Sequence, residues 1–307
     1  MSILEVKHTT IYRYSQPVRF GEHRMMFRPR DSHDMRLRDT LLTISPAPAS
    51  TRWLHDVFGN SIAIVSFDAM AAELCFESVI RLEHFPIDGP EFSIEEYARV
   101  YPFSYSAEEV PDLGRTIERH YPDPDHRVDA WARDFVVSAG QPADTLAVLA
   151  AMTEGIRRDF TYAARTAEGT QTPVETLDSR SGTCRDFALL MMEGVRSLGL
   201  AARFVTGYLY DPARDSGTTA DEAAEPAPAV TGGGSTHAWV QVYLPGVGWA
   251  EYDPTNGIIG SRNLIRVAVT RDPSQAVPLS GSWMGEEGAS FLGMTVDVQV
   301  NTAEFCE

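Results

Sequence analysis

Apolar and polar side chains alternate in short runs along the first 88 residues. Residues 9–14 form one such run, and residues 61–65 form another after the turn sequence at residues 56–60. Alternation with a period of two places every second side chain on the same face of a strand. Several such strands without helical periodicity predict an all-β sandwich or barrel. Prolines and a glycine follow, so we expect this N-terminal β domain to span residues 1–89.

From residue 90 onward, apolar positions recur every three or four residues, which is typical of helices. Asp144 can cap one helix, whose apolar face is formed by Leu146, Leu149, Met152 and Ile156. A second helix is expected from residue 128 to residue 137. We assign residues 90–307 to a second domain.

A third helical pattern begins at Cys184. Ser181 or Thr183 can cap this helix, and its apolar stripe is formed by Phe187, Met191, Val195 and Leu198. The N-terminus of a helix carries a positive partial charge and free N–H groups, which favour a thiolate and could hold an oxyanion. A small buried cysteine that merely opens a core helix explains this segment equally well.

His237 opens a strongly alternating strand. Ala238, Val240, Val242 and Leu244 share its apolar face, so His237 and Trp239 lie on the opposite face. A lone histidine on a strand is usually structural, but this face favours a position in a cleft.

The next strand ends at Asp253, before a proline. If the two strands form a hairpin, Asp253 shares the face of His237 only when it lies opposite His237 or Trp239. A tight turn that pairs Leu244 with Trp249 would place Asp253 on the wrong face. We therefore predict an odd-length loop or a bulge. The three residue types fit one chemistry: a thiolate attacks a carbonyl, an imidazole moves the proton, and a carboxylate orients the imidazole.

Residues 211–235 are rich in Asp, Glu, Ala, Pro, Thr and Gly. Such a composition contributes little to a core, so we expect a mobile insertion. An interdomain linker is the alternative, but the candidate chemistry lies on both sides of this segment. An insertion within one domain is therefore favoured.

The formal net charge of −17 disfavours nucleic acid and anionic membranes as partners. Five arginines between residues 24 and 38 are most simply a solvated face. The chain lacks a run of about 18 apolar residues, and its charged N-terminus does not resemble a signal peptide. We expect a cytoplasmic protein.

The three cysteines are too few and too far apart for a disulfide framework or a zinc site. Cys75 has apolar neighbours, which indicates a buried structural thiol, and Cys306 lies next to the end of the sequence. The acidic residues from 211 to 222 lack the ligand spacing of a calcium loop. We predict neither a metal nor another cofactor.

Four segments together resemble a known family: residues 182–188 (Gly-Thr-Cys-Arg-Asp-Phe-Ala), 203–208 (Arg-Phe-Val-Thr-Gly-Tyr), 237–240 (His-Ala-Trp-Val) and 248–257 (Gly-Trp-Ala-Glu-Tyr-Asp-Pro-Thr-Asn-Gly). They are similar to the transglutaminase-like superfamily, and within it to bacterial members with an N-terminal β domain that are named as cysteine proteases. Weaker similarity covers residues 8–14, 27–30, 56–60 and 271–278.

The resemblance implies an α+β fold with a papain-like core, in which the cysteine helix packs on an antiparallel sheet that carries the His and Asp strands. It also implies a catalytic triad, which falls on Cys184, His237 and Asp253. The chain departs from the family pattern in its long insertion and in the tract after Arg271, which lacks the usual tyrosine. Both departures bear on the choice of substrate.

Other residues near these segments have two interpretations each. The Tyr162 hydroxyl could complete an oxyanion hole with the backbone N–H of Cys184, or Tyr162 could simply pack. Trp239 could form a wall of the substrate cleft, or pack in the core. We expect Asp186 to act as a local structural cap.

We expect a cysteine protease or amidase that acts on peptides or on side-chain amides, with water resolving the thioester. A protein-glutamine transglutaminase shares the first half of this reaction and is the alternative. A different class is a non-catalytic peptide-binding module, in which the N-terminal β domain makes the contacts.

Overall fold

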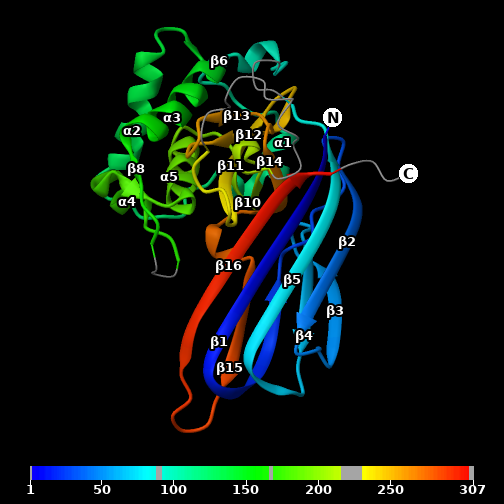
Figure 1. Cartoon of the computed structure of the whole chain (residues 1–307). Helices are drawn as coiled ribbons and strands as arrows, with labels where there is room; N and C mark the ends of the chain where they lie inside the picture. Colours follow the sequence, from blue (N-terminus) through cyan, green and yellow to red (C-terminus); the bar gives the residue numbers. More distant parts are fainter. Residues whose placement is uncertain (1, 88–91, 166–168, 216–229, 304–307) are drawn as a thin grey trace.

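The computed structural model describes residues 2–87, 92–165, 169–215 and 230–303 (Figure 1). The domain boundary predicted at residue 89, Cys306 and the central part of the predicted insertion lie outside the described residues. None of the helices in these four ranges is long and apolar enough to cross a membrane.

An antiparallel sheet forms the elongated part of the molecule in Figure 1. Its strands lie in the order β2 (Met35–Ser45), β5 (Met70–His84), β1 (Ser2–Met25), β4 (Ser61–Ser66) and β3 (Ser50–His55), and β15 (Leu279–Met284) and β16 (Phe291–Thr302) also pair with β1. The alternating pattern of the N-terminal residues thus correctly predicted an all-β unit. Its core includes Val18, Phe20, Leu74 and Phe76.

The last two strands correct the predicted domain assignment. β16 pairs with residues 4–14 of β1, and β15 pairs with residues 19–25 of the same strand. Residues 279–302 therefore belong to the sheet of the N-terminal unit, although we assigned them to the second domain. Alternation at Val296, Val298 and Val300 indicates a strand, but it carries no information on which distant strand becomes the partner.

The second unit combines helices with a sheet in the order β13 (Ile258–Ile259), β12 (Gly248–Asp253), β11 (His237–Leu244), β10 (Ala202–Leu209) and β14 (Leu264–Thr270). Its α-helices are α1 (Glu109–Leu113), α2 (Arg127–Ser138), α3 (Thr145–Asp159), α4 (Pro173–Ser179) and α5 (Cys184–Ser197). Two small sheets pair β6 (Val100–Tyr101) with β7 (Ala143–Asp144), and β8 (Thr161–Tyr162) with β9 (Ser181–Gly182). Short 3-10 helices span Glu96–Ala98, Gly114–Thr116, Pro212–Arg214 and Pro273–Gln275.

The predicted helices are confirmed, and the α+β class with them. Asp144 caps α3, since its side chain accepts a hydrogen bond of 2.8 Å from the N–H of Ala147. The helix predicted at residues 128–137 corresponds to α2. The central helix α5 packs on β11 and β10 and shares one hydrophobic core with α2, α3 and the apolar face of β11.

The two units share a further core. Leu4, Val6, Ile80 and Leu82 of the N-terminal sheet pack with Tyr208, Ile265 and Val267 of the second unit. The Tyr208 hydroxyl lies 2.9 Å from Nδ1 of the buried His8. The shared core and the contact between Tyr208 and His8 hold β10 and β14 against the N-terminal sheet.

Candidate active site

The start of α5 is held by hydrogen bonds that converge on one buried carboxylate. Asp186 Oδ2 accepts hydrogen bonds from the N–H of Thr183 at 2.8 Å and from its hydroxyl at 2.9 Å. Asp186 Oδ1 accepts from Gln171 N–H at 2.7 Å and from Arg165 at 3.1 Å. Thr183 is thus the N-cap residue, and Asp186 has the structural role that the sequence predicted.

Cys184 is the first residue of α5, and 6% of its surface is exposed. The next residue, Arg185, donates hydrogen bonds to the carbonyls of Pro273 at 2.7 Å and Ala276 at 3.2 Å. These bonds tie the start of the helix to the segment that follows β14. The thiol therefore sits on a rigid support, at a helix end where backbone N–H groups have no intrahelical acceptor.

His237 and Asp253 form a buried pair. Nε2 of His237 lies 2.8 Å from Asp253 Oδ2, and at most 1% of either residue is exposed. Complete burial alone raises the pKa of Asp253, but the charge of His237 and hydrogen bonds from His237, Asn256 and Thr255 outweigh it and lower that pKa. Asp253 is therefore a carboxylate oriented toward the imidazole.

The register of the hairpin explains why these two residues meet. Leu244 pairs with Gly248, so the loop between β11 and β12 contains three residues. Val240 pairs with Tyr252, which brings Asp253 opposite Trp239. This register confirms the prediction of an odd-length loop, and it is one of the two registers that place both side chains on the same face.

The second ring nitrogen of His237 is turned toward Cys184. Burial lowers the pKa of His237, but the charges of Asp253 and Cys184 and hydrogen bonds to both outweigh it and raise that pKa to about 10. Among the described residues, Nδ1 has no hydrogen-bond partner of standard geometry. The contact with the sulfur is therefore longer or less directed than a standard hydrogen bond, which is common in active sites without substrate.

Asn256 was not predicted, although it organises the site. Its side-chain amide donates to Asp253 Oδ2 at 2.8 Å and to the carbonyl of Thr231 at 3.2 Å. Its side-chain oxygen, Oδ1, accepts a hydrogen bond from the N–H of Thr231 at 2.8 Å. Asn256 thus joins the carboxylate to the end of the insertion. The turn sequence Asp-Pro-Thr-Asn-Gly at residues 253–257 carried a signal for such local bonding.

Gly232 is a second residue that the sequence did not indicate. Its φ is +91°, and a Cβ atom at this position would lie 3.1 Å from Nδ1 of His237 and 3.9 Å from the Tyr162 hydroxyl. The described end of the predicted insertion therefore packs over the imidazole. Only a residue without a side chain fits here unstrained.

Tyr162 lies beside the cysteine, as expected. Strand β8 runs parallel to β9, with Tyr162 opposite Gly182. Burial raises the pKa of Tyr162, and the charges of Cys184 and Asp186 raise it further. Tyr162 is 36% exposed. Its role as an oxyanion donor stays a prediction.

Trp239 packs in the core, which is the second of the two roles predicted for it. It is fully buried, and its Nε1 donates to Glu251 Oε2 at 3.1 Å. Its ring stacks on the His237 ring, with 6.0 Å between the centroids and 28° between the planes. A fully buried ring cannot form a wall of an open cleft, so Trp239 supports the imidazole from behind.

The described residues contain no group of three His, Cys, Asp or Glu side chains that could hold a metal ion. A cavity on the sheet face of Gln241 and Glu251 is lined by other residues and does not include Cys184, His237 or Asp253. The chemistry available at the start of α5 is therefore that of a thiol, an imidazole and a carboxylate.

Comparisons with known proteins agree with this geometry. A family model described as the bacterial transglutaminase-like N-terminal region matches residues 4–83, and the model of the transglutaminase-like superfamily matches residues 129–254. The uncharacterized protein Rv2569c of Mycobacterium tuberculosis (strain ATCC 25618 / H37Rv) is 30% identical over 309 residues, which cover 95% of this chain and 91% of the relative.

One solved structure is similar along the whole chain. A proposed cysteine protease from Cytophaga hutchinsonii matches with a TM-score of 0.66 and 18% identity, over 100% of this chain and 93% of that protein. At this identity the match shows a common fold.

Proposed function

Because this chain belongs to the transglutaminase-like superfamily, we propose that it is a cysteine-dependent amide hydrolase, a protease or peptidase, with Cys184 as nucleophile. The observation that carries the proposal is the position of Cys184 at the start of α5, next to the buried pair of His237 and Asp253. The Cytophaga protein with the same fold is named for the same activity, which favours hydrolysis over amine transfer.

Each residue has a defined task in the proposed reaction. The Cys184 thiolate forms a bond to the carbonyl carbon of the amide, and the carbonyl oxygen becomes an oxyanion near the N-terminus of α5. His237 then gives the proton on Nδ1 to the leaving amine as the C–N bond breaks. Asp253 holds the other ring nitrogen throughout.

The thioester is resolved by water. His237 takes a proton from the water as it attacks the thioester carbon, and the acid product leaves as the thiolate forms again. A primary amine in place of water would give the transglutaminase reaction. The Tyr162 hydroxyl is our candidate for the second oxyanion donor, and a peptide or protein is the expected substrate. The cytoplasmic location inferred from the sequence stays a prediction.

The first experiment separates an enzyme from a binding module. We expect Cys184→Ala to lower kcat/KM for peptide cleavage by several orders of magnitude, because the reaction has no other nucleophile. Cys75→Ala is the matched control and should retain activity within about twofold. Equal activity of the wild-type and Cys184→Ala proteins would reject the enzyme.

The second experiment separates hydrolysis from amine transfer. A glutamine-containing peptide is incubated with the enzyme, with and without a primary amine, and ammonia release and amine incorporation are measured by mass spectrometry. We expect hydrolysis to exceed incorporation. The opposite ratio would make the protein a transglutaminase while leaving the roles of Cys184 and His237 unchanged.

The third experiment measures the reactivity of the thiols. We expect iodoacetamide to label Cys184 faster than Cys75 near neutral pH, since the imidazole of His237 can act as a base for the thiol at the start of α5. Burial and the charges of Glu73 and Glu77 raise the pKa of Cys75 and slow its reaction. Cys306 is compared in the same digest, and equal rates for the three thiols would count against the proposed nucleophile.

A further inference from the structure

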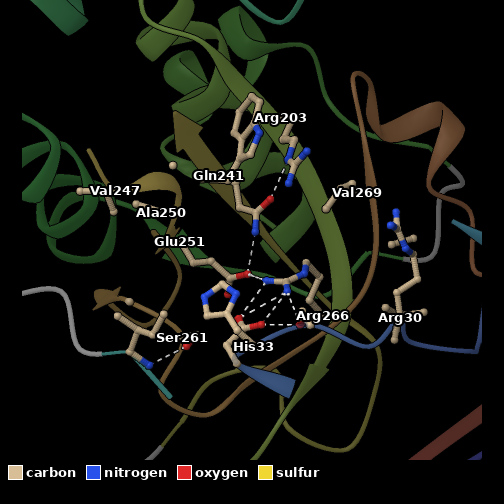
Figure 2. Close-up of a pocket in the computed structure, with 18 of the residues that line it drawn as sticks. Arg30, His33, Arg203, Gln241, Val247, Ala250, Glu251, Ser261, Arg266 and Val269 are labelled. Carbon is tan, nitrogen blue, oxygen red and sulfur yellow. Dashed lines mark hydrogen bonds and ion pairs between the residues drawn. The ribbon is translucent and has the colours of Figure 1, made fainter. Parts of the chain in front are cut away.

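A cavity of about 390 Å³ lies between the two units of the molecule (Figure 2), and its lining does not include the candidate catalytic residues. Loop residues of the N-terminal unit, including Arg30 and Phe58, form one side. The other side is the face of the core sheet opposite α5, where Gln241 alternates with the α5-facing Val240 and Val242. The proposed amide hydrolysis makes no use of this space.

The acidic side chains deep in the cavity are already paired. Arg266 binds Asp34 at 3.1 Å and Glu251 at 2.5 Å, and both carboxylates are buried. Figure 2 shows these contacts as a network that continues through Gln241 to Arg203. At the exposed side, Asp31 accepts a hydrogen bond from the N–H of Leu37.

Two arginines of the cavity lack such partners. Arg203 donates from Nε to Gln241 at 2.7 Å, and its guanidinium lies 4.0 Å from the centroid of the Trp249 ring. Arg30 donates to the carbonyl of Phe58 at 3.3 Å. Within the four described ranges, neither arginine forms an ion pair with a carboxylate. The terminal N–H groups of the Arg203 guanidinium thus remain available to a ligand.

The surroundings of Arg203 make its positive charge costly. Burial lowers the pKa of Arg203, the charge of Arg266 lowers it further, and the partly opposing effect of Glu251 leaves it at about 9. The charge of Arg30 acts in the same direction as that of Arg266. A buried charge without a counterion is unfavourable, and an anion bound between Arg203 and Arg30 would remove that cost.

The walls of the cavity define the class of anion. A guanidinium offers parallel N–H groups that match the two oxygens of a carboxylate. Trp249, Phe58 and Phe92 add aromatic surface, and the volume suits a small molecule. A phosphate dianion would use the aromatic walls poorly, and Asp34 and Glu251 would repel it more strongly than a monoanion.

We propose that this cavity is a second binding site of the protein, which takes a small organic acid with an aromatic or apolar body. Its carboxylate binds Arg203 and Arg30, and its body packs against Trp249 and Phe58. The site belongs to the interface between the units, and its lining does not include Cys184, His237 or Asp253.

Calorimetry on the full-length protein tests the site with phenylacetate as the probe. Phenylacetamide is the neutral isostere, and inorganic phosphate is the compact dianion. We expect phenylacetate to bind at least about tenfold more tightly than either of the other two. Cys184→Ala protein should bind phenylacetate like the wild type, which separates this site from the proposed active site.

Arginine variants test which side chains bind the carboxylate of phenylacetate. We expect Arg30→Gln to weaken phenylacetate binding about fivefold, and Arg203→Lys, which keeps the charge but loses the planar fork, about tenfold. Arg52→Gln is the control, since Arg52 is exposed on β3 and forms a surface ion pair with Glu22 at 3.7 Å. Arg30 is exposed too, so we expect its substitution to leave the fold intact.

Three results of the binding comparisons would overturn the proposal, in addition to a failure to bind at all. They are equal affinities for phenylacetate and phenylacetamide, tighter binding of phosphate than of phenylacetate, and an Arg52→Gln effect as large as that of Arg30→Gln. The absence of binding up to about 10 mM phenylacetate, where even a weak site would be half-filled, would overturn it as well.

Discussion

At the scale of single residues, the buried pair of His237 and Asp253 is the central feature of the site. The carboxylate receives hydrogen bonds from Asn256 and from the N–H of Thr255 as well as from the imidazole. These bonds satisfy a buried charge that would otherwise destabilise the fold. The same bonds fix the ring plane of the proposed general base.

This pair predicts an unusual titration of His237. Its pKa is raised to about 10, so the imidazolium persists at neutral pH. The stability that this shift contributes is complete below pH 6.5 and is lost as the pH rises through about 10. NMR titration of the ring protons should show the high midpoint, and Asp253→Asn should lower it.

His8 provides an internal reference in the same spectrum. Burial lowers the pKa of His8 to about 4, against a small opposing effect of Asp297. The two histidines should therefore titrate on opposite sides of 6.5. A His237 midpoint at or below 6.5 would contradict the charge pairing with Asp253.

The sequence indicated side chains of distinctive chemistry and missed those that act through shape. Cys184, His237 and Asp253 were predicted because their types, local strand or helix pattern and spacing all point to one chemistry. Asn256 and Gly232 were missed because their roles depend on a loop that returns from a distance. Trp239 was ambiguous, since alternation gives the face of a strand but not what covers that face.

At the scale of elements, the described end of the insertion, residues 230–235, closes over the imidazole. Gly232 lies against Nδ1 of His237, and the Asn256 side chain binds both the backbone N–H and the backbone carbonyl of Thr231. The insertion is thus continuous with the site.

Gly232→Ala tests this arrangement. We expect kcat/KM to fall about tenfold or more, because the new methyl group displaces the imidazole from its position beside the thiol. The positive φ also costs about 1–2 kcal/mol of stability. Gly288→Ala is the matched control, since Gly288 has a φ of +89° with nothing nearby. It should lose similar stability but retain activity.

An equal loss of activity in the two glycine variants would indicate that backbone strain alone is responsible.

The helices and strands themselves were largely predictable from the sequence. The helix caps at Asp144 and Thr183 and the odd hairpin loop follow from local chemistry and face parity. The partners of β15 and β16 were not predictable, because pairing between the ends of a chain leaves no local pattern.

At the scale of the whole molecule, the two units are joined by a shared hydrophobic core and by a buried ionic network. Asp34 of the N-terminal unit contacts Arg266 of β14, which also contacts Glu251 of β12. Glu251 in turn binds Trp239, which stacks on His237. The N-terminal unit is therefore part of the support of the site.

Asp34→Asn should lower the free energy of unfolding by about 2–3 kcal/mol, because it leaves the partly buried Arg266 with one counterion fewer. Burial raises the pKa of Asp34, but the charge of Arg266 and hydrogen bonds from Ser32 and Arg266 outweigh it and lower that pKa. The contribution of this ion pair is thus present above pH 3.8 and is lost as the pH falls through the folded-state pKa.

Urea unfolding of Glu22→Gln provides the comparison, since Glu22 forms an exposed ion pair with Arg52 at 3.7 Å. We expect that substitution to change stability by less than about 0.5 kcal/mol. Similar losses in both variants would mean that the contact between Asp34 and Arg266 contributes no more than an exposed ion pair.

The pairing of β1 with β16 also affects the order in which the sheet folds. Leu4 lies opposite Thr302, so one edge of β1 has no partner until a strand far later in the sequence is available. Contacts this distant in sequence slow folding. Until they form, a bare strand edge on the nascent chain is a template for wrong pairing. Completion of this sheet is therefore a late step of folding, and until then the open edge of β1 exposes the chain to aggregation.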